Sequence, residues 1–305
     1  MIADTNLTTE SAHRIVATQF PQFRDEVPTL LGQGWDNFCI IYPDQTVFRL
    51  PTRKVGAEIL VNECHALPHL RPQLDLPIPD FQHFGVPQDD YPYPFVGYPL
   101  LPGQTADRMT WTDEERARQV QPLANFLNQL HAIEFTNSPL QDLPDDTIFR
   151  KDPISLLEKI ETRCQILQDS PQTPSDLDLT AILKWARALA PTIRPTARVV
   201  IVHGDLYPRH LIANERRQVT GIIDWGDTHR GHPALDLSLA YTFVLPTQRE
   251  RFFAAYHHPL EDSDLQLAAL RAAMYGTSLM VYGQTIDDHT IKSLAHQILK
   301  SLPIW

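Results

Sequence analysis

The chain has 305 residues, of which 43% are hydrophobic and 21% charged, a composition typical of a soluble globular protein with one large domain or two lobes. Its net charge of -11 argues against a nucleic-acid-binding protein and favours cationic ligands. The three cysteines form no CxxC pair, and no apolar run reaches the ~18 residues of a membrane span. The first residues lack a signal-peptide pattern. We therefore expect a cytoplasmic protein with no membrane or nucleic-acid partner.

The first third of the sequence is rich in β-prone residues. Two such runs between Phe38 and Leu50 flank Pro43-Asp44-Gln45, which predicts a hairpin. From Lys54 to Leu67 apolar residues recur at helical spacing. A proline-rich stretch follows, with a short strand-like piece over residues 94–101.

The remaining sequence is mainly helical. Thr112 and Glu115 predict a capping box at a helix start. An apolar stripe then runs from Val120 to Ile133, in which Pro122 is a candidate for a kink. A hairpin is predicted between His210 and Asp224. More helical segments are predicted near residues 154–168, near residues 176–190 and from Pro233 onward.

This order of elements predicts the fold class. We expect an α+β fold in which a small antiparallel-sheet N-terminal lobe, residues 1–100, precedes a larger helical C-terminal lobe, residues 101–305.

Gly32 and Gly34 stand in the segment LLGQGWDNF, between two stretches that are expected to form strands. A dinucleotide-binding glycine loop is followed by a helix, whereas a glycine loop between two strands is typical of a loop folded over nucleotide phosphates. A simple turn accounts for the same two glycines, so the loop alone leaves both interpretations open.

Glu63 lies on the apolar stripe of the helix predicted over residues 54–67. A carboxylate on such a face is costly unless it is paired. Arg49, on the second strand of the hairpin, could pair with it if the helix packs on the strands. Glu63 could instead lie at the solvent edge of the stripe, but beside the glycine loop we favour the pair, with Arg49 directed at phosphates.

Two aspartates end β-prone runs in the second half of the chain: Asp205 in VIVHGDLYPRHLI and Asp224 in VTGIIDWGD. The hairpin predicted between them brings both carboxylates to one edge. Two close carboxylates repel each other, so we expect a divalent cation there, and magnesium prefers oxygen ligands together with substrate phosphates. Both aspartates could instead be turn residues, but a turn does not require the proline, arginine and histidine that follow Asp205.

The segments HGDLYPRHLI and IIDWGD resemble the catalytic and metal-binding motifs of the aminoglycoside/macrolide phosphotransferase family. Its members are small-molecule kinases with a bilobal, protein-kinase-like fold, and the resemblance extends over nearly the whole chain. Further segments resemble other parts of the family. LGQGWDN resembles its phosphate loop, VFRLP its strand with the phosphate-binding cation, and NECHALP its helix with the partner glutamate. YPFVGYPLLPG resembles its interlobe hinge, and HPALDLS the stretch after the metal-binding aspartate.

The resemblance implies roles for residues of the C-terminal lobe. Asp205 would orient or deprotonate the attacking hydroxyl, and Asp224 would bind the Mg²⁺ ion that bridges the nucleotide phosphates. His210 occupies the position of the second metal ligand, where kinases usually have Asn; neutral imidazole binds metals but suits magnesium less well than oxygen does. Asp236 would brace the catalytic loop through hydrogen bonds.

For the N-terminal lobe the resemblance implies a nucleotide-binding site, in which backbone groups of the hinge receive the purine. Its expected residues are Gly32, Gly34, Arg49, Glu63, Tyr98 and Leu100. Arg49 stands where kinases usually have Lys. It keeps the positive charge and can bind phosphate through two donors, although with a different geometry.

The resemblance thus implies a kinase, monomeric or weakly dimeric, that transfers the γ-phosphoryl group of Mg-bound ATP or GTP to a hydroxyl of an antibiotic-like acceptor, either a macrolide or an aminoglycoside. The HGDxxPxH form points towards macrolide-like acceptors. A metabolite kinase of the same fold, acting on choline, homoserine or a sugar, is an alternative, as is a degenerate module that binds nucleotide with little turnover. A protein kinase is disfavoured, because Gly204 stands where protein kinases have Arg and the chain between Asp224 and Asp236 is short.

Overall fold

The computed structural model describes residues 4–34, 36–146 and 150–304, and the chain divides into two compact units. Unit 1 comprises residues 1–72, 77–101 and 225–227, and unit 2 comprises residues 73–76, 102–224 and 228–305. The expected α+β class, with an antiparallel sheet in the N-terminal part and helices in the C-terminal part, is confirmed.

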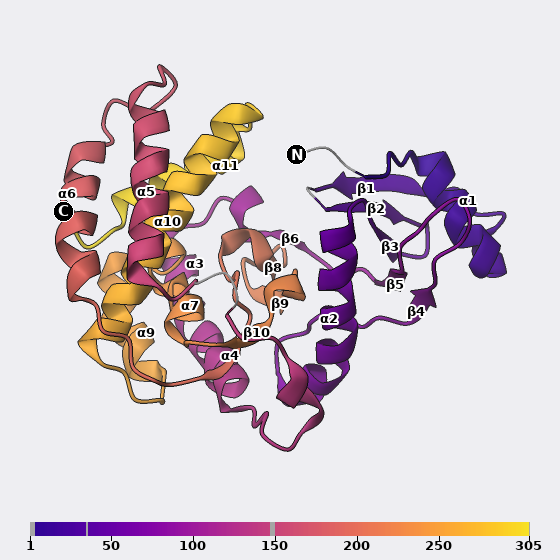
Figure 1. Cartoon of the computed structure of the whole chain (residues 1–305), viewed down its shortest axis with the longest axis horizontal. Helices are drawn as coiled ribbons and strands as arrows, with labels where there is room; N and C mark the ends of the chain where they lie inside the picture. The colour runs from indigo at the N-terminus through magenta and orange to yellow at the C-terminus, as the bar shows by residue number, and fades with distance from the viewer. Residues whose placement is uncertain (1–3, 35, 147–149, 305) are drawn as a thin grey trace. The chain divides into compact units, whose positions relative to one another are not determined.

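Unit 1 is built on an antiparallel sheet with the strand order β1-β2-β3-β5-β4 (Figure 1). Its elements in chain order are α1 (Thr9–Gln19), β1 (Thr29–Gln33), β2 (Asn37–Ile41), β3 (Thr46–Pro51), α2 (Lys54–Leu70), β4 (His83–Gly85) and β5 (Phe95–Pro99). The predicted hairpin is confirmed as β2 and β3, in which Cys39 pairs with Arg49. Helix α1 was not predicted, although its buried residues Ala12, Ile15 and Val16 have helical spacing.

The side chains of β3 alternate between the two faces of the sheet. Phe48 and Leu50 lie in an aromatic core to which α1 contributes Ile15 and Val16. Arg49 therefore points to the opposite face, where α2 packs against β3. Figure 1 shows α1 and α2 on opposite sides of the strands.

Unit 2 is mainly helical, with short strands around the loops of interest. Its elements in chain order are β6 (Gln104–Thr105), α3 (Asp113–Arg118), α4 (Val120–Ala132), α5 (Pro153–Gln168), α6 (Leu179–Leu189), β7 (Val200–Val202), β8 (Leu211–Ala213), β9 (Val219–Ile222), β10 (His229–Gly231), α7 (Ala234–Leu237), α8 (Leu239–Thr242), α9 (Arg249–Ala255), α10 (Asp262–Thr285) and α11 (His289–Lys300). Strand β7 pairs with β10, and β8 lies between β6 and β9.

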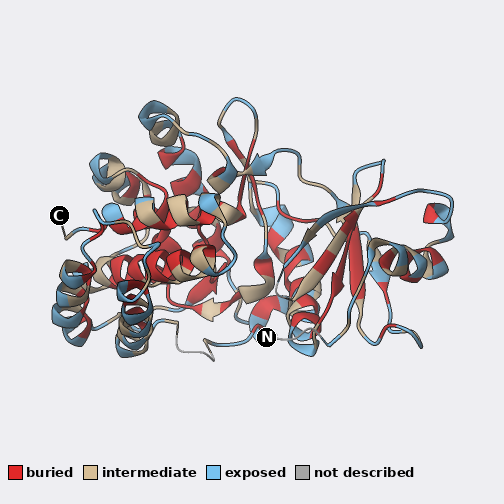
Figure 2. Cartoon of the chain, turned by 90° about the horizontal axis from the view of Figure 1, so that it is seen from above, coloured by how far each residue is buried: buried red, intermediate tan, exposed pale blue. Residues whose placement is uncertain are grey.

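Helix α10 forms the centre of unit 2, where it packs against α5, α6, α7, α8 and α11. Most of its residues are buried, and Figure 2 shows how buried residues line the inward faces of the helices in this unit. A helix covered on nearly every side is expected to be apolar all round. Arg271 departs from that rule: it is buried in the middle of α10, where a charge must be compensated by partners.

Some boundaries differ from the expected ones for identifiable reasons. The capping box of Thr112 and Glu115 is confirmed. The apolar stripe that follows belongs to a separate helix, α4, because α3 ends with the C-cap residue Gln119. The side chain of Gln119 bonds to the backbone of Arg217 and Val219. Pro122 lies in the first turn of α4, where its missing N–H is not needed, so it causes no kink. None of the helices in the described ranges combines the length and hydropathy of a membrane span.

Candidate active site

Asp205 and Asp224 follow strands β7 and β9 at sharp turns of unit 2. Gly204, directly before Asp205, has a φ of 82°, in the left-handed region that glycine adopts without strain. Asp224 itself has a φ of 65°, which costs a residue with a side chain of order 1–3 kcal/mol. Such a conformation persists only where the surroundings impose it, so the backbone at Asp224 is set by the fold.

His203 joins the two segments that carry these aspartates. Its Nδ1 accepts a hydrogen bond from the Asp205 N–H at 3.3 Å, and its Nε2 donates to the carbonyl oxygen of Ile223 at 3.0 Å. The imidazole is fully buried, and burial lowers its pKa, so the neutral form with the proton on Nε2 is favoured.

His210 lies between the two carboxylates. Its Nδ1 is 2.6 Å from the carbonyl oxygen of Asp205 and 3.7 Å from Asp205 Oδ2, and its Nε2 is 3.2 Å from Asp224 Oδ2. Burial lowers the pKa of His210, but the charge and hydrogen bond of Asp224, followed by those of Asp205, more than offset this and raise it to about 9.

The geometry of His210 and Asp224 fits a magnesium ion. With the Nδ1 proton donated to Asp205, Nε2 and the Asp224 carboxylate face each other and require a cation between them, either a second proton or a metal ion. Their separation of 3.2 Å is close to the roughly 3 Å between adjacent ligands of an octahedral Mg²⁺ ion. No group of three or more His, Cys, Asp or Glu side chains suited to a metal occurs in the described ranges, so phosphate and water oxygens would complete the shell.

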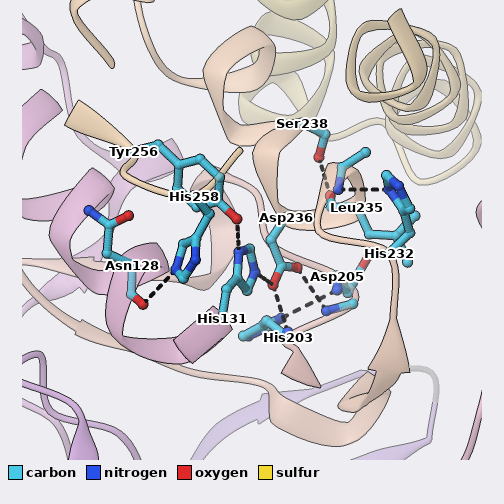
Figure 3. Close-up of polar contacts among 12 residues, drawn as sticks. Asn128, His131, His203, Asp205, His232, Leu235, Asp236, Ser238, Tyr256 and His258 are labelled. Carbon is cyan, nitrogen blue, oxygen red and sulfur yellow. Dashed lines mark hydrogen bonds and ion pairs between the residues drawn. The ribbon is translucent and has the colours of Figure 1, made fainter. Parts of the chain in front are cut away.

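Asp236 braces the loop that carries Asp205, as the sequence suggested (Figure 3). Its Oδ1 accepts the N–H of Gly204 at 2.9 Å, and its Oδ2 accepts the N–H of His203 at 2.8 Å and Nε2 of His131 at 3.2 Å. Tyr256 in turn donates to His131 Nδ1 at 2.7 Å. Complete burial raises the pKa of Asp236, but the hydrogen bond and charge of His131, followed by His203 and Gly204, lower it below its ordinary value.

Two further residues hold Asp205 and its loop, and the sequence alone did not indicate either of them. Tyr275 Oη donates to Asp205 Oδ1 at 2.7 Å, and Arg271 Nη2 donates to Tyr275 Oη at 2.9 Å and to the carbonyl oxygen of Gly204 at 2.5 Å. Both side chains come from α10, one helical turn apart. An arginine and a tyrosine at this spacing in the otherwise apolar stretch LAALRAAMYG are the signal that could have revealed them.

In unit 1 the expected pair of Arg49 and Glu63 forms. Arg49 Nη2 lies 2.6 Å from Glu63 Oε2, and the two side chains are only 10% and 2% exposed. The alternative, with Glu63 at the solvent edge of its helix, is therefore wrong. Gly226, two residues after Asp224 in sequence, packs on the same helix: a Cβ at this position would lie 2.3 Å from Ile59 Cγ2 and 3.0 Å from Glu63 Oε1.

Of the two glycines of the expected phosphate loop, Gly32 lies within β1, opposite Cys39 of β2 and next to a shift of register, and only Gly34 follows the strand. A Cβ at Gly32 would meet no atom within 4 Å, and the Gly34 N–H donates to the carbonyl oxygen of Asn37 at 2.9 Å, which closes the turn into β2. Neither glycine has a left-handed φ, so neither packing nor backbone strain requires it. Trp35 of the same loop lies outside the described residues.

The two expected hinge residues lie at the end of β5. Tyr98 is paired with Val47 across the sheet, and its ring packs on Phe81 with centroids 5.2 Å apart. The N–H of Leu100 donates to the carbonyl oxygen of Gln45 at 2.9 Å. A purine could bind this N–H only by replacing that bond.

The structure thus brings five of the nine predicted site residues together in two groups, and Gly32, Gly34, Tyr98 and Leu100 belong to neither of them. Asp205, His210 and Asp224 form a cluster in unit 2, and Arg49 pairs with Glu63 in unit 1.

Comparisons with known proteins place the chain in a family. The sequence model of the "Phosphotransferase enzyme family" matches residues 28–270. The uncharacterized protein YcbJ of Bacillus subtilis (strain 168) is 22% identical over 239 residues, which span 73% of this chain and 72% of that protein.

Two solved structures share the fold over nearly their whole lengths. The GDP complex of wild-type aminoglycoside 2'-phosphotransferase-IIIa has a TM-score of 0.71 and 24% sequence identity, and the match covers 96% of this chain and 98% of that one. Macrolide 2'-phosphotransferase type I has a TM-score of 0.62 and 17% identity, with 97% of each chain covered. At these identities the two structures show the fold alone.

The resemblance to the aminoglycoside/macrolide phosphotransferases is confirmed, and so is the expectation of a phosphotransferase. The matched segment contains the pair in unit 1 and the cluster of Asp205, His210 and Asp224 in unit 2. Because the match covers most of the chain, the chain belongs to the phosphotransferase enzyme family.

Proposed function

We propose that this phosphotransferase transfers the γ-phosphoryl group of a Mg²⁺-bound nucleoside triphosphate to a hydroxyl group of an antibiotic-like small molecule, a macrolide or an aminoglycoside. The observation that carries the proposal is the cluster in unit 2. There, the imidazole of His210 lies between the carboxylates of Asp205 and Asp224. The Asp205 side chain is half-buried, whereas that of Asp224 is more than half exposed. This difference in exposure supports a division in which one carboxylate would handle a proton and the other would hold a cation.

The two carboxylates would have different tasks. Asp205 would orient the acceptor hydroxyl and take up its proton. Asp224 and His210 would hold Mg²⁺, which would neutralise the charge of the nucleotide phosphates when it is bound. In phosphoryl transfer most of the catalysis comes from such positioning and charge compensation, so a small number of well-held groups is sufficient.

Nucleotide binding would fall to the N-terminal lobe, residues 1–100, and catalysis and acceptor binding to residues 101–305. Arg49, oriented by Glu63, would contact phosphates, and the open space at Gly32 and Gly34 would allow phosphates to approach the backbone. Backbone groups of Tyr98 and Leu100 would receive the base. The GDP in the aminoglycoside phosphotransferase structure supports a nucleotide donor but does not decide between ATP and GTP.

Two observations support the acceptor class. The solved structures that share the fold act, by their names, on aminoglycosides and macrolides. The net charge of -11 would favour the cationic amino groups that such antibiotics carry.

The proposal is tested by measuring consumption of ATP and of GTP, each with Mg²⁺, against macrolides, aminoglycosides and small metabolite alcohols. Consumption that depends on a macrolide or aminoglycoside would support it; consumption that depends only on choline, homoserine or a sugar would assign the chain to metabolite kinases. In parallel, Asp224→Ala should weaken Mg²⁺-dependent nucleotide binding in calorimetry, while Asp25→Ala, at an exposed position of unit 1, should not. Unchanged Mg²⁺-nucleotide affinity would remove Asp224 from the metal site.

A further inference from the structure

A buried pair on α10 contacts the loop of Asp205. Arg271 is 3% exposed and Tyr275 is 6% exposed, and both reach the loop from one side of the helix. Arg271 donates to the carbonyl oxygen of Gly204 and to Tyr275 Oη, and Tyr275 Oη lies 2.7 Å from Asp205 Oδ1. The pair belongs to unit 2, like the loop that it contacts.

The numbers of protons that Arg271 and Tyr275 can donate determine the direction of these hydrogen bonds. A guanidinium group only donates, so Tyr275 Oη must accept from Arg271. A tyrosine hydroxyl has a single proton, and the remaining partner within reach is the Asp205 carboxylate, which accepts it. Two further groups pack on the ring: Arg271 Cζ lies over it, 4.9 Å from its centroid, and the Tyr207 ring stacks on it with centroids 5.0 Å apart and an interplanar angle of 26°.

As a result, the two oxygens of Asp205 are not equivalent. Oδ1 is occupied by the Tyr275 hydroxyl. Among the described residues, the nearest donor recorded for Oδ2 is His210 Nδ1 at 3.7 Å, which is too long for a hydrogen bond. The side chain of Asp205 is 29% exposed, so a ligand can reach it, and Oδ2 is the oxygen that the Tyr275 hydroxyl leaves unused.

We propose that Tyr275, held by Arg271, is a positioning residue that fixes the Asp205 carboxylate and reserves Oδ2 for the acceptor hydroxyl. This inference rests on the proposed function. In the step that it serves, the acceptor O–H proton passes to Asp205 Oδ2 and the acceptor oxygen forms a bond to the γ-phosphorus. The bond from that phosphorus to the β–γ bridging oxygen breaks, and the nucleoside diphosphate leaves with the electron pair.

The substitution Tyr275→Phe tests the inference, because it keeps the ring and its stack on Tyr207 and removes only the hydroxyl. Loss of a hydrogen bond to a charged group that acts in the transition state should lower kcat by about 10- to 100-fold. The KM values for nucleotide and acceptor should change by less than about threefold, because Tyr275 is buried and its hydroxyl is bonded to Asp205.

A matched control is Tyr42→Phe, which removes another buried tyrosine hydroxyl, one that lies 2.9 Å from His13 Nδ1 in unit 1. It should lower the melting temperature as much as Tyr275→Phe does and leave kcat unchanged. A structure of Tyr275→Phe should show the Asp205 carboxylate turned from its original orientation.

The outcomes separate the inference from the function on which it rests. If the unmodified chain turns over an acceptor and Tyr275→Phe matches its kcat, the inference is overturned and the proposed function stands. The inference is also overturned if Tyr275→Phe lowers kcat only as much as Tyr42→Phe does. If the unmodified chain shows no acceptor-dependent turnover at all, the proposed function fails and the inference fails with it.

Discussion

The hydrogen bonds of Asp236 make the substitution Asp236→Asn a sensitive test of the brace behind Asp205. The carboxylate is fully buried and accepts three hydrogen bonds, from the N–H groups of His203 and Gly204 and from His131 Nε2. An asparagine has the same shape but only one acceptor oxygen, and its amide group brings two donors. In either orientation of the amide, its nitrogen lies at hydrogen-bond distance from a backbone N–H, that of His203 or that of Gly204. Two donors then face each other and no hydrogen bond forms.

The cost follows from these contacts. A hydrogen bond to a charged group contributes about 1.5–3 kcal/mol, and a buried donor left unpaired costs about 1–3 kcal/mol. We therefore expect Asp236→Asn to lower the free energy of unfolding by about 3–5 kcal/mol. For a unit of this size each kcal/mol shifts the melting temperature by about 2–4 °C, so the expected fall is roughly 6–20 °C.

The assay is thermal unfolding followed by circular dichroism, with Ser238→Ala as the matched control. Ser238 is also fully buried, two residues along the same segment, and its hydroxyl donates to the carbonyl oxygen of Leu235 at 2.7 Å rather than to the loop of Asp205 (Figure 3). Its loss should cost about 1 kcal/mol. If Asp236→Asn melts no lower than Ser238→Ala, the three hydrogen bonds do not stabilise the loop as we argue.

Further predictions follow from the same contacts. Because the folded-state pKa of Asp236 is lowered, its contribution is complete above the unfolded pKa of about 3.9 and is lost as the pH falls through the folded value, so the melting temperatures of the unmodified chain and Asp236→Asn should converge as the pH falls below about 4. Glu63→Ala removes the partner of the buried Arg49 and should lower the free energy of unfolding by about 3 kcal/mol in urea titrations, whereas an unchanged midpoint would mean that the pair is not stabilising. Gly226→Ala places a methyl group 2.3 Å from a side-chain atom of α2 and should cost about 1–3 kcal/mol in the same titrations, so an undiminished stability would contradict the close packing. His210→Asn replaces a nitrogen ligand by an oxygen and should keep or strengthen Mg²⁺-dependent nucleotide binding in calorimetry, whereas a loss like that of His210→Ala would show that the imidazole itself is required.

Much of the fold could be predicted because the local sequence and the tertiary structure agree. The β2–β3 hairpin has β-prone residues on both sides of a turn, and the capping box of Thr112 and Glu115 is a local signal that needs no tertiary context. Helix α1 was missed because its apolar residues are few, and it is stabilised mainly by packing on the aromatic core of the sheet.

In the candidate site, too, some contacts follow from the local sequence and others depend on tertiary packing. Asp205 and His210 precede the short hairpin of β8 and β9 and Asp224 follows it, so their proximity follows from local chain geometry. Tyr275 lies 70 residues after Asp205, and only the packing of α10 against its neighbours brings the two together. Nothing in the sequence near Asp205 indicates that contact. The buried Arg271 was the available clue, since a charge in an apolar helix requires a specific partner.

The central claim is that Asp205 serves phosphoryl transfer to an acceptor hydroxyl, and mass spectrometry of the acceptor tests it most directly. The unmodified chain and Asp205→Ala would each be incubated with Mg²⁺, nucleoside triphosphate and a macrolide or aminoglycoside. We predict that the unmodified chain adds a phosphate to the acceptor and that Asp205→Ala does so orders of magnitude more slowly while binding nucleotide equally well. Equal phosphorylation by both proteins would contradict the account.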